Sequence, residues 1–179
     1  MKIIKTRLEY DLKLRTEMDF PVKGIEFIDI NTIFTNSKIY KDIINEFINE
    51  IKDKNIDYII SPEARGFLLG SPVSAILDIP FIPVRKKNKL PPSTIELQVE
   101  YEKEYGKDIL CFPKIIDDVY DKKKFYIIDD IYATGNTIKA MVNGIESLGG
   151  IVAGIGAFIN IKELNNDDIF SILEVNEKH

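Results

Sequence analysis

Short apolar runs alternate with amphipathic segments along most of the chain, and this alternation predicts the fold class. Two segments, 37–51 and 136–150, place apolar residues three and four positions apart, as a helix with one buried face does. The apolar runs of strand length are 57–61, 80–85, 108–112, 125–129 and 151–160. Strands that alternate with helices favour a parallel sheet covered on both faces. We therefore expect an α/β fold, a parallel sheet flanked by helices.

Local signals predict further helical features. The segment from Thr6 to Met18 is expected to be helical, with Leu8 and Leu12 on one face. Ser37 is expected to cap the helix that follows it. Another helix is expected at 66–78, where Pro72 either sits early or causes a kink.

Two segments carry loop signals instead. Residues 20–31, "FPVKGIEFIDIN", are predicted to form a loop or a short strand. Residues 86–107 are polar, charged and marked by prolines, and are predicted to form one long loop, a feature that is often functional in a compact domain. Because no repeat or Gly/Ser linker interrupts the chain, 1–179 is expected to be a single domain.

The composition narrows the possible partners. The chain has 179 residues, of which 45% are apolar and 30% charged, as in an ordinary soluble domain with a sizeable core. Its net charge of −5 argues against nucleic-acid binding, which usually needs a basic face. No apolar run suits a membrane span or a signal peptide, so we expect no membrane partner and a cytoplasmic location.

The single cysteine and the single histidine limit the chemistry. Cys111 lies in an apolar run, so its expected role is core packing, and one cysteine cannot form an internal disulfide. His179 is the last residue, so neither a catalytic histidine nor a multi-histidine metal site is expected.

The ends of the predicted strands point to one ligand site. In parallel sheets, ligands bind beyond the carboxyl ends of the strands. Residues 61–65, 85–89 and 129–137 each follow a predicted strand, so we expect these three segments to meet at one edge of the sheet.

The stretch "FYIIDDIYATGNT" (125–137) joins a buried strand, two acids, a loop of small residues and a helix. Small residues let a ligand approach the backbone, and N–H groups near a helix N-terminus favour an anion such as phosphate. Asp129 and Asp130 would repel that phosphate, so they suit sugar hydroxyls or a hydrated cation. The unit therefore suits a sugar phosphate.

Other interpretations of this stretch are simpler. Asp130 could cap the helix while Asp129 ends a strand in solvent, which is the commoner role of an isolated acid pair. A nucleotidase strand of the Walker B type would need a G-x-x-x-x-G-K-[ST] partner, which the sequence lacks. The fragment "GIGAF" (154–158) lacks the third glycine of a dinucleotide fingerprint.

Several blocks together resemble a known family. "YIIDDIYATGNT" is similar to the phosphoribosyl-pyrophosphate motif of type I phosphoribosyltransferases. "FPVKGIEFIDI", "PEARGFLLGSPVS", "FIPVRKKNKLP" and "EYGKDIL" occur in the order and rough spacing of adenine phosphoribosyltransferases. Five blocks in order, from Phe20 to about Asn160, are far more specific than one motif.

The resemblance implies a fold and a reaction. The fold adds to the sheet a small N-terminal hood, here within 1–36, and a mobile catalytic loop, here 86–107. The reaction is purine salvage, in which adenine and 5-phosphoribosyl 1-pyrophosphate give AMP and pyrophosphate. Mg²⁺ accompanies the donor, and the enzyme is expected to be a homodimer.

The resemblance also assigns roles to residues of this chain. Asp129 and Asp130 would hold the ribose hydroxyls, stabilise positive charge on the sugar ring, and contact Mg²⁺ directly or through water. Arg65, with backbone groups at Ala64, would hold the pyrophosphate. Backbone groups near Ile25 and Glu26 would recognise the base. The 5-phosphate would be held by Ala133, Thr134, Gly135, Asn136 and Thr137.

Two charged clusters gain a function only through the resemblance. Arg85, Lys86, Lys87 and Lys89 would otherwise form a solvated loop, but in this family the segment reaches the pyrophosphate, partly across a dimer interface. Glu104 would otherwise be one of several acids in a charged loop. Aligned with the family, Glu104 and Tyr105 belong to the mobile loop, where the carboxylate would orient or deprotonate the base.

Three departures from the family pattern affect the prediction. Ile28 stands where the family usually has an arginine, and it offers no donors to a base. Asn136 replaces a glycine of the phosphate loop, although asparagine tolerates a left-handed backbone. The segment before "EYGK" is about two residues longer than expected.

Alternative functions follow from these departures. The base could be hypoxanthine, guanine or xanthine, because "IELQVEY" has a faint likeness to loops of enzymes that use those bases. The chain could instead be a non-catalytic phosphoribosyl-pyrophosphate-binding regulator or an inactive structural subunit. The residues before Phe20 are too few for the DNA-binding winged helix that such regulators carry, and the chain is acidic. Both features favour an enzyme over a regulator.

Overall fold

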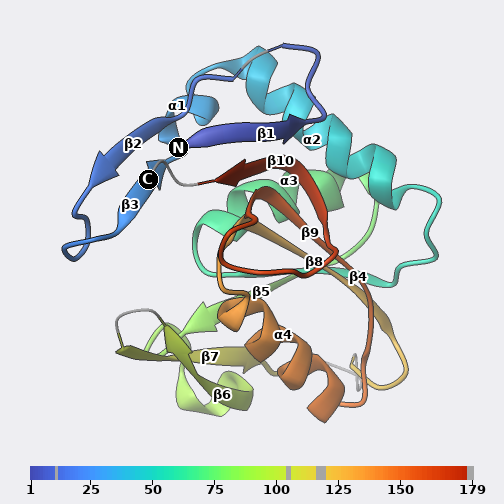
Figure 1. Ribbon diagram of the computed structural model, residues 1–179. Helices are drawn as coiled ribbons and strands as arrows, with labels where there is room; N and C mark the ends of the chain where they lie inside the picture. Colours follow the sequence, from blue (N-terminus) through green and yellow to red (C-terminus); the bar gives the residue numbers. More distant parts are fainter. Residues whose placement is uncertain (11, 104–105, 116–119, 177–179) are drawn as a thin grey trace.

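Five parallel strands form the centre of one eight-stranded sheet. They stand in the order β10 (Phe170–Asn176), β9 (Ile151–Ile161), β8 (Lys124–Tyr132), β4 (Tyr58–Pro62) and β5 (Phe81–Lys86). The computed structural model describes residues 1–10, 12–103, 106–115 and 120–176. Figure 1 shows the strands twisting across the middle of the molecule, and the predicted parallel sheet flanked by helices is confirmed.

Antiparallel strands extend this sheet at both edges. On one edge, β1 (Lys2–Thr6) pairs with β10. On the other edge, β7 (Gly106–Pro113) pairs with β5, and β6 (Ile95–Lys103) pairs with β7. The sheet is therefore mixed, with its parallel part at the centre.

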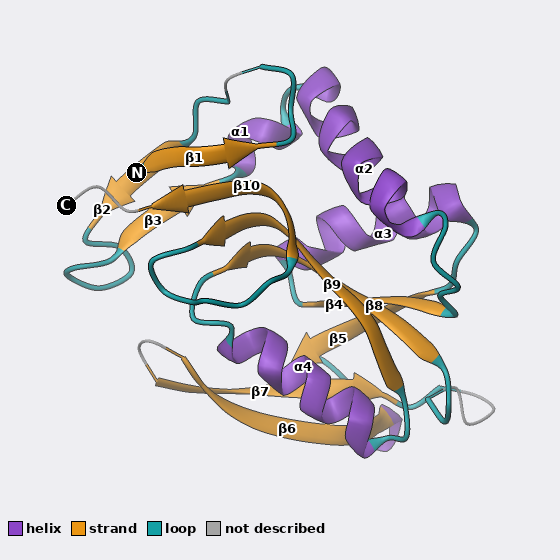
Figure 2. Cartoon of the chain, turned by 45° about the vertical axis from the view of Figure 1, so that its right-hand side comes forward, coloured by secondary structure: helices purple, strands orange, loops and turns teal. Residues whose placement is uncertain are grey.

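Helices cover both faces of the sheet. In Figure 2, α2 (Ser37–Ile51) and α3 (Arg65–Leu77) lie on one side of the strands and α4 (Asn136–Ser147) on the other. The run at the start of β8 shows why: Tyr126 and Ile128 pack into the core under α2 and α3, whereas Phe125 and Ile127 pack into the core under α4. A strand buried on both faces is apolar throughout, which explains its continuous apolar run. Among the described residues, no helix is long and apolar enough to cross a membrane.

A separate two-stranded sheet forms the hood. It pairs β2 (Arg15–Met18) with β3 (Glu26–Asp29), and the short helix α1 (Asn31–Phe34) follows. Figure 1 shows it beside the main sheet, close to the ends of the central strands. The strand character predicted within 20–31 is confirmed by β3.

The helix predicted from Thr6 to Met18 is wrong. Strand β1 ends at Thr6, and β2 begins at Arg15. Leu8 and Leu12 are buried as expected, but they reach the core from irregular chain. Their spacing mimicked a helix, whereas the two ends of the segment pair in sheets instead: Thr6 with β10 and Arg15–Met18 with β3.

The single long loop predicted at 86–107 is also wrong over most of its length. A 3-10 turn, η1 (Pro92–Thr94), leads into the nine residues of β6, which pair with β7 as an antiparallel hairpin. Leu97, Val99 and Tyr101 pack toward the core under α4, and Gln98 and Glu100 alternate with them. This period-two alternation is a strand signal that the loop prediction overlooked.

Two helix predictions need smaller changes. The residue that caps α2 is Asn36, not Ser37: its Oδ1 accepts hydrogen bonds from the backbone N–H of Lys38 at 3.1 Å and of Ile39 at 3.2 Å. Pro72 lies inside α3 rather than in its first turn.

Candidate active site

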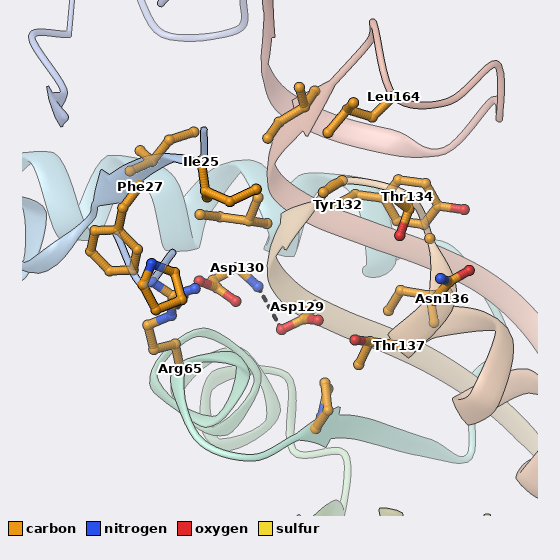
Figure 3. Close-up of a pocket in the computed structure, with 18 of the residues that line it drawn as sticks. Ile25, Phe27, Arg65, Asp129, Asp130, Tyr132, Thr134, Asn136, Thr137 and Leu164 are labelled. Carbon is orange, nitrogen blue, oxygen red and sulfur yellow. Dashed lines mark hydrogen bonds and ion pairs between the residues drawn. The ribbon is translucent and has the colours of Figure 1, made fainter. Parts of the chain in front are cut away.

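A cavity of about 750 Å³ opens beyond the carboxyl ends of β4 and β8, next to the hood. Its walls come from the hood, the β4–α3 turn, the β8–α4 loop and the segment after β9. Figure 3 shows Arg65 and Phe27 on one side, Thr134 and Asn136 on the other, and Asp129 and Asp130 between them. The segments after β4 and β8 therefore meet as predicted.

The β8–α4 loop forms the anion-binding wall. Gly135 is the N-cap residue of α4 and has a φ of 77°, which glycine adopts without strain. A Cβ on Gly135 would clash with the Tyr132 hydroxyl oxygen, so this loop packs directly on the tyrosine ring. The first N–H groups of a helix lack intrahelical acceptors and favour an anion. The predicted cup residues all line the cavity: Ala133, Thr134, Gly135, Asn136 and Thr137.

The family usually has a glycine in place of Asn136, which suggested a left-handed backbone at this position, but Asn136 does not adopt one. It is the first residue of α4, and the positive φ of this loop belongs to Gly135. The asparagine side chain is therefore compatible with the loop.

Two buried carboxylates form the floor of the cavity. Asp129 and Asp130 are each only 6% exposed and belong to β8, which continues past them to Tyr132. Asp129 Oδ1 accepts the backbone N–H of Asp130 at 2.8 Å. Burial, followed by the neighbouring Asp130 charge, raises the pKa of Asp129 well above its usual range, although Arg65 opposes the shift. Neither acid is a helix cap or a solvated strand end, so the simpler interpretation of this pair is wrong.

Arg65 reaches the acids from the opposite wall. It is the first residue of α3, its Nε lies 2.7 Å from Asp130 Oδ2, and its guanidinium carbon lies 5.5 Å from the centre of the Phe27 ring. A Cβ on Gly66 would lie 3.0 Å from Asp129 Oδ1, so the glycine lets α3 approach β8 this closely. The arginine is thus held between the hood and the floor, with Ala64 beside it in the cavity wall.

The predicted cationic cluster is divided in the structure. Lys86 lines the cavity and lies 3.6 Å from Asp108, whereas Arg85 and Lys89 are not among the lining residues. Arg85 instead donates to Glu63, through Nε at 3.1 Å and Nη2 at 3.4 Å. Although burial opposes it, these bonds and one from the Lys86 N–H lower the pKa of Glu63. Arg85 thereby stabilises the β4–α3 turn, which contains Glu63 and leads to Arg65.

The hood contributes the apolar wall of the cavity. Ile25 and Glu26 line it as predicted, together with Phe27 and Ile28. Ile28 is 5% exposed and packs partly into the core, so a longer polar residue has no place there in this arrangement.

Some lining residues escaped the sequence analysis. Tyr132 lies between the acids and the phosphate loop, where only its position in the motif could have drawn attention to it. Tyr101 comes from β6, which was predicted as loop. Leu164 follows β9, in a segment that carries no motif.

Glu104 and Tyr105 lie outside the described residues. The described parts of β6 and β7 approach each other directly before and after them, where Lys103 pairs with Gly106. In residues 1–10, 12–103, 106–115 and 120–176, no group of three or more metal-ligating side chains comes together.

Comparisons with known proteins identify the family. The sequence pattern of the family described as Phosphoribosyl transferase domain matches residues 30–178. An adenine phosphoribosyltransferase of Clostridium perfringens is 44% identical over 163 residues, which is 91% of this chain and 92% of the relative. The chain belongs to the adenine phosphoribosyltransferase family. Another member, from Clostridium novyi, is 40% identical over 90% of this chain and 95% of its own length.

Solved structures of adenine phosphoribosyltransferases have the same fold. The structure from Thermoanaerobacter pseudethanolicus has a TM-score of 0.80 and 38% identity, covering 90% of this chain and 95% of its own. The Saccharomyces cerevisiae enzyme, solved with adenine and an imino-altritol bisphosphate, has a TM-score of 0.79 and 31% identity, covering 89% and 94%. Membership of the family accounts for the order of the sequence blocks and for the hood.

Proposed function

We propose that the protein transfers the 5-phosphoribosyl group of 5-phosphoribosyl 1-pyrophosphate to adenine, producing AMP and pyrophosphate. The observation that carries this proposal is the cavity, which brings an anion-binding loop, two buried carboxylates and an arginine together beside an apolar hood. Relatives with this name cover nearly the whole chain, and the yeast relative was solved with adenine.

Each wall of the cavity has one task in the proposed reaction. The β8–α4 loop holds the 5-phosphate, and the acids accept hydrogen bonds from the ribose hydroxyls. A nitrogen of adenine attacks the anomeric carbon while the bond between that carbon and pyrophosphate breaks. The proton on the attacking adenine passes to a general base. The buried carboxylates stabilise the positive charge that develops on the sugar, an effect that is strong in a site shielded from water.

We assign the pyrophosphate leaving group to the opposite wall. Arg65 uses Nε on Asp130, and its two Nη groups carry the donors that match pyrophosphate oxygens. Lys86 adds positive charge to the same cavity. Arg85, Lys87 and Lys89 belong to the same segment and are proposed to reach the donor in the assembled enzyme. This local charge explains how a chain of net charge −5 binds so anionic a substrate.

Glu104 and Tyr105 remain part of the proposal through the "EYG" match. Glu104 is proposed to orient the base or take its proton as the base attacks. The described strands on either side of these two residues, β6 and β7, pair with each other, and Tyr101 of β6 lines the cavity.

The acid pair fits Mg²⁺. It supplies buried carboxylate oxygens at the floor of the cavity, and a bound Mg²⁺ would share Asp130 Oδ2 with Arg65 Nε, which lies 2.7 Å away. Mg²⁺ commonly uses one or two carboxylates and takes its other ligands from water and substrate phosphates. Bound there, Mg²⁺ would neutralise charge on the pyrophosphate. Asp129 and Asp130 would hold the ion directly or through water.

A homodimer is the proposed assembly. Helix α3 is apolar on most sides, and Leu68 (45% exposed) and Ile76 (62% exposed) face outward eight residues apart, on one side of the helix. A helix that is apolar all round is normally buried, so a second copy of the chain suits this surface. A cytoplasmic location is also proposed, supported by the lone buried Cys111.

Sedimentation tests the dimer. We expect the protein to sediment as a dimer, and Ile76→Glu to sediment as a monomer, because it buries a charge in the interface. Ile151→Glu, at an exposed isoleucine of the main sheet, is the matched control and should leave the dimer intact. A monomeric native protein, or a dimer unaffected by Ile76→Glu, contradicts the assignment of α3.

A nucleotide-formation assay tests the function. The purified protein is incubated with the donor, Mg²⁺ and one purine at a time, and we expect AMP from adenine and at least about 10²-fold less product from hypoxanthine, guanine or xanthine. IMP, GMP or XMP as the main product would assign the protein to the other bases. Donor binding without turnover on any purine would make it a regulator.

A further inference from the structure

The segment between β9 and β10 holds the phosphate loop from behind, and the proposed reaction uses none of its polar side chains. Asn165 is the centre of this contact. Its side-chain Nδ2 lies 2.8 Å from the Ala133 carbonyl oxygen, 2.9 Å from Asn160 Oδ1 and 2.9 Å from the Ile161 carbonyl oxygen. One amide group therefore joins the end of β9 to the first residue of the loop.

The bond to Ala133 has a consequence for its neighbour Thr134. The Ala133 carbonyl and the Thr134 N–H belong to one planar trans peptide, so they point in opposite directions. Asn165 is not among the residues that line the cavity, so the Ala133 carbonyl that it binds points away from the cavity and the Thr134 N–H points toward it. That N–H belongs to the wall on which the 5-phosphate is proposed to bind.

A second side chain of the segment acts on the same loop through Tyr132. The Tyr132 hydroxyl donates to Asp167 Oδ2 at 2.6 Å, and the ring lies directly under Gly135. Burial, aided by the Asp167 carboxylate, raises the pKa of Tyr132, so its hydroxyl stays a donor at any physiological pH. Asp167 thus fixes the ring on which the glycine of the loop rests.

The segment itself is built to keep both side chains in place. Asn165 Oδ1 accepts the Asp167 N–H at 3.2 Å, and Lys162 Nζ donates to the Asp167 carbonyl at 3.1 Å. Asn160, which accepts from Asn165, is only 1% exposed. Within the described residues, the neighbouring side chains of Asn166 and Asp168 are exposed and make no hydrogen bond or ion pair.

We propose that Asn165 and Asp167 are positioning residues that preset the 5-phosphate loop, one through the Ala133 carbonyl and the other through Tyr132. The inference rests on the proposed function of that loop. A loop whose N–H groups already point at the phosphate loses little entropy on binding, so affinity for the 5-phosphate depends on these two side chains.

Calorimetry with ribose 5-phosphate and with adenine tests this proposal on the intact protein. We expect Asn165→Ala and Asp167→Asn each to weaken ribose 5-phosphate binding about tenfold, and to leave adenine binding within about twofold. In turnover assays, KM for the donor should rise about tenfold while kcat falls less. Asn166→Ala and Asp168→Asn are matched controls one residue away and should behave as the native protein.

If Asn165→Ala folds poorly, Tyr132→Phe provides a second test of the positioning role. It removes the hydroxyl that donates to Asp167 but keeps the ring under Gly135, and it should weaken ribose 5-phosphate binding in the same way. Unchanged affinity in the folded variants, or an equal loss of adenine binding, overturns the positioning role. Failure of the native protein to bind ribose 5-phosphate would instead overturn the assignment of the loop.

Discussion

Replacing Asp130 by asparagine should reduce turnover by about 10² to 10³-fold, the size of effect seen when one preorganised group is removed from a transition state. The carboxylate is buried at the floor of the cavity, and its Oδ2 lies 2.7 Å from Arg65 Nε. Asparagine keeps its shape but loses the negative charge that would face the developing positive charge on the sugar. The measurement is kcat for AMP formation at saturating donor and adenine.

The fold should tolerate this substitution. Removing the Asp130 charge costs the ion pair with Arg65, but the arginine side chain is 39% exposed and can be solvated instead. The change also relieves repulsion between the two neighbouring acids. The melting temperature should stay within about 3 °C of the native value, a shift worth about 1 kcal/mol in a domain of this size.

An exposed aspartate provides the control for Asp130. Asp53 follows α2 and is exposed, so Asp53→Asn should retain both full turnover and native stability. If Asp130→Asn keeps native turnover, the carboxylate has no part in the reaction. If it unfolds instead, Asp130 is a structural residue.

Replacing Asp129 by asparagine should have two opposite effects: turnover falls, and the fold becomes more stable at neutral pH. Burial and the Asp130 charge raise the pKa of Asp129, so the native state opposes its ionisation. A neutral amide avoids that cost, keeps an oxygen for the Asp130 N–H, and adds an N–H₂ group beside the Asp130 carboxylate. We expect the melting temperature to rise by about 3 °C or more at pH 7.5.

The pH dependence gives the sharper test. A carboxyl whose pKa is raised on folding contributes stability that is fully present below the ordinary pKa and is lost as pH rises toward the folded value. Asparagine does not titrate, so the stability gained by Asp129→Asn should be small near pH 4.5 and should grow as pH rises. Chemical denaturation at both ends of this range measures it. A gain that is constant with pH, or a loss of stability, contradicts the raised pKa.

The arrangement of the two acids costs stability. The carboxylates are placed side by side and nearly out of water, where they repel each other, and Arg65 offsets only part of that repulsion. Binding sites often retain such arrangements because the charge is needed by the ligand.

The sequence predicted those elements whose signals are local. The helix α4 and the strand β8 have unbroken periodicity or unbroken apolarity, and both were found with the acids and small residues at their junction. The strand β1 was missed because its pairing partner, β10, lies far away in the sequence, and Leu8 and Leu12 favoured a helix in the segment that follows it. The strand β6 pairs locally with β7 and has alternating apolar and polar residues from Ile95 to Tyr101, but the prolines and charges around it favoured a loop.

Some ligand-binding residues were likewise indicated by the sequence alone, and others were revealed only by the tertiary structure. The order of five motifs and the adjacency of Asp129, Asp130 and the small loop are properties of the chain itself, and they determined the family and the expected phosphate cup. The tertiary structure decided which charges share the cavity: it pairs Arg65 with Asp130, and it directs Arg85 to Glu63. It also brings Asn165 and Asp167 behind the phosphate loop, 32 and 35 residues along the chain from the residues that they contact. Contacts of this kind arise when β8 and β9 pair in register, so no short stretch of sequence contains them.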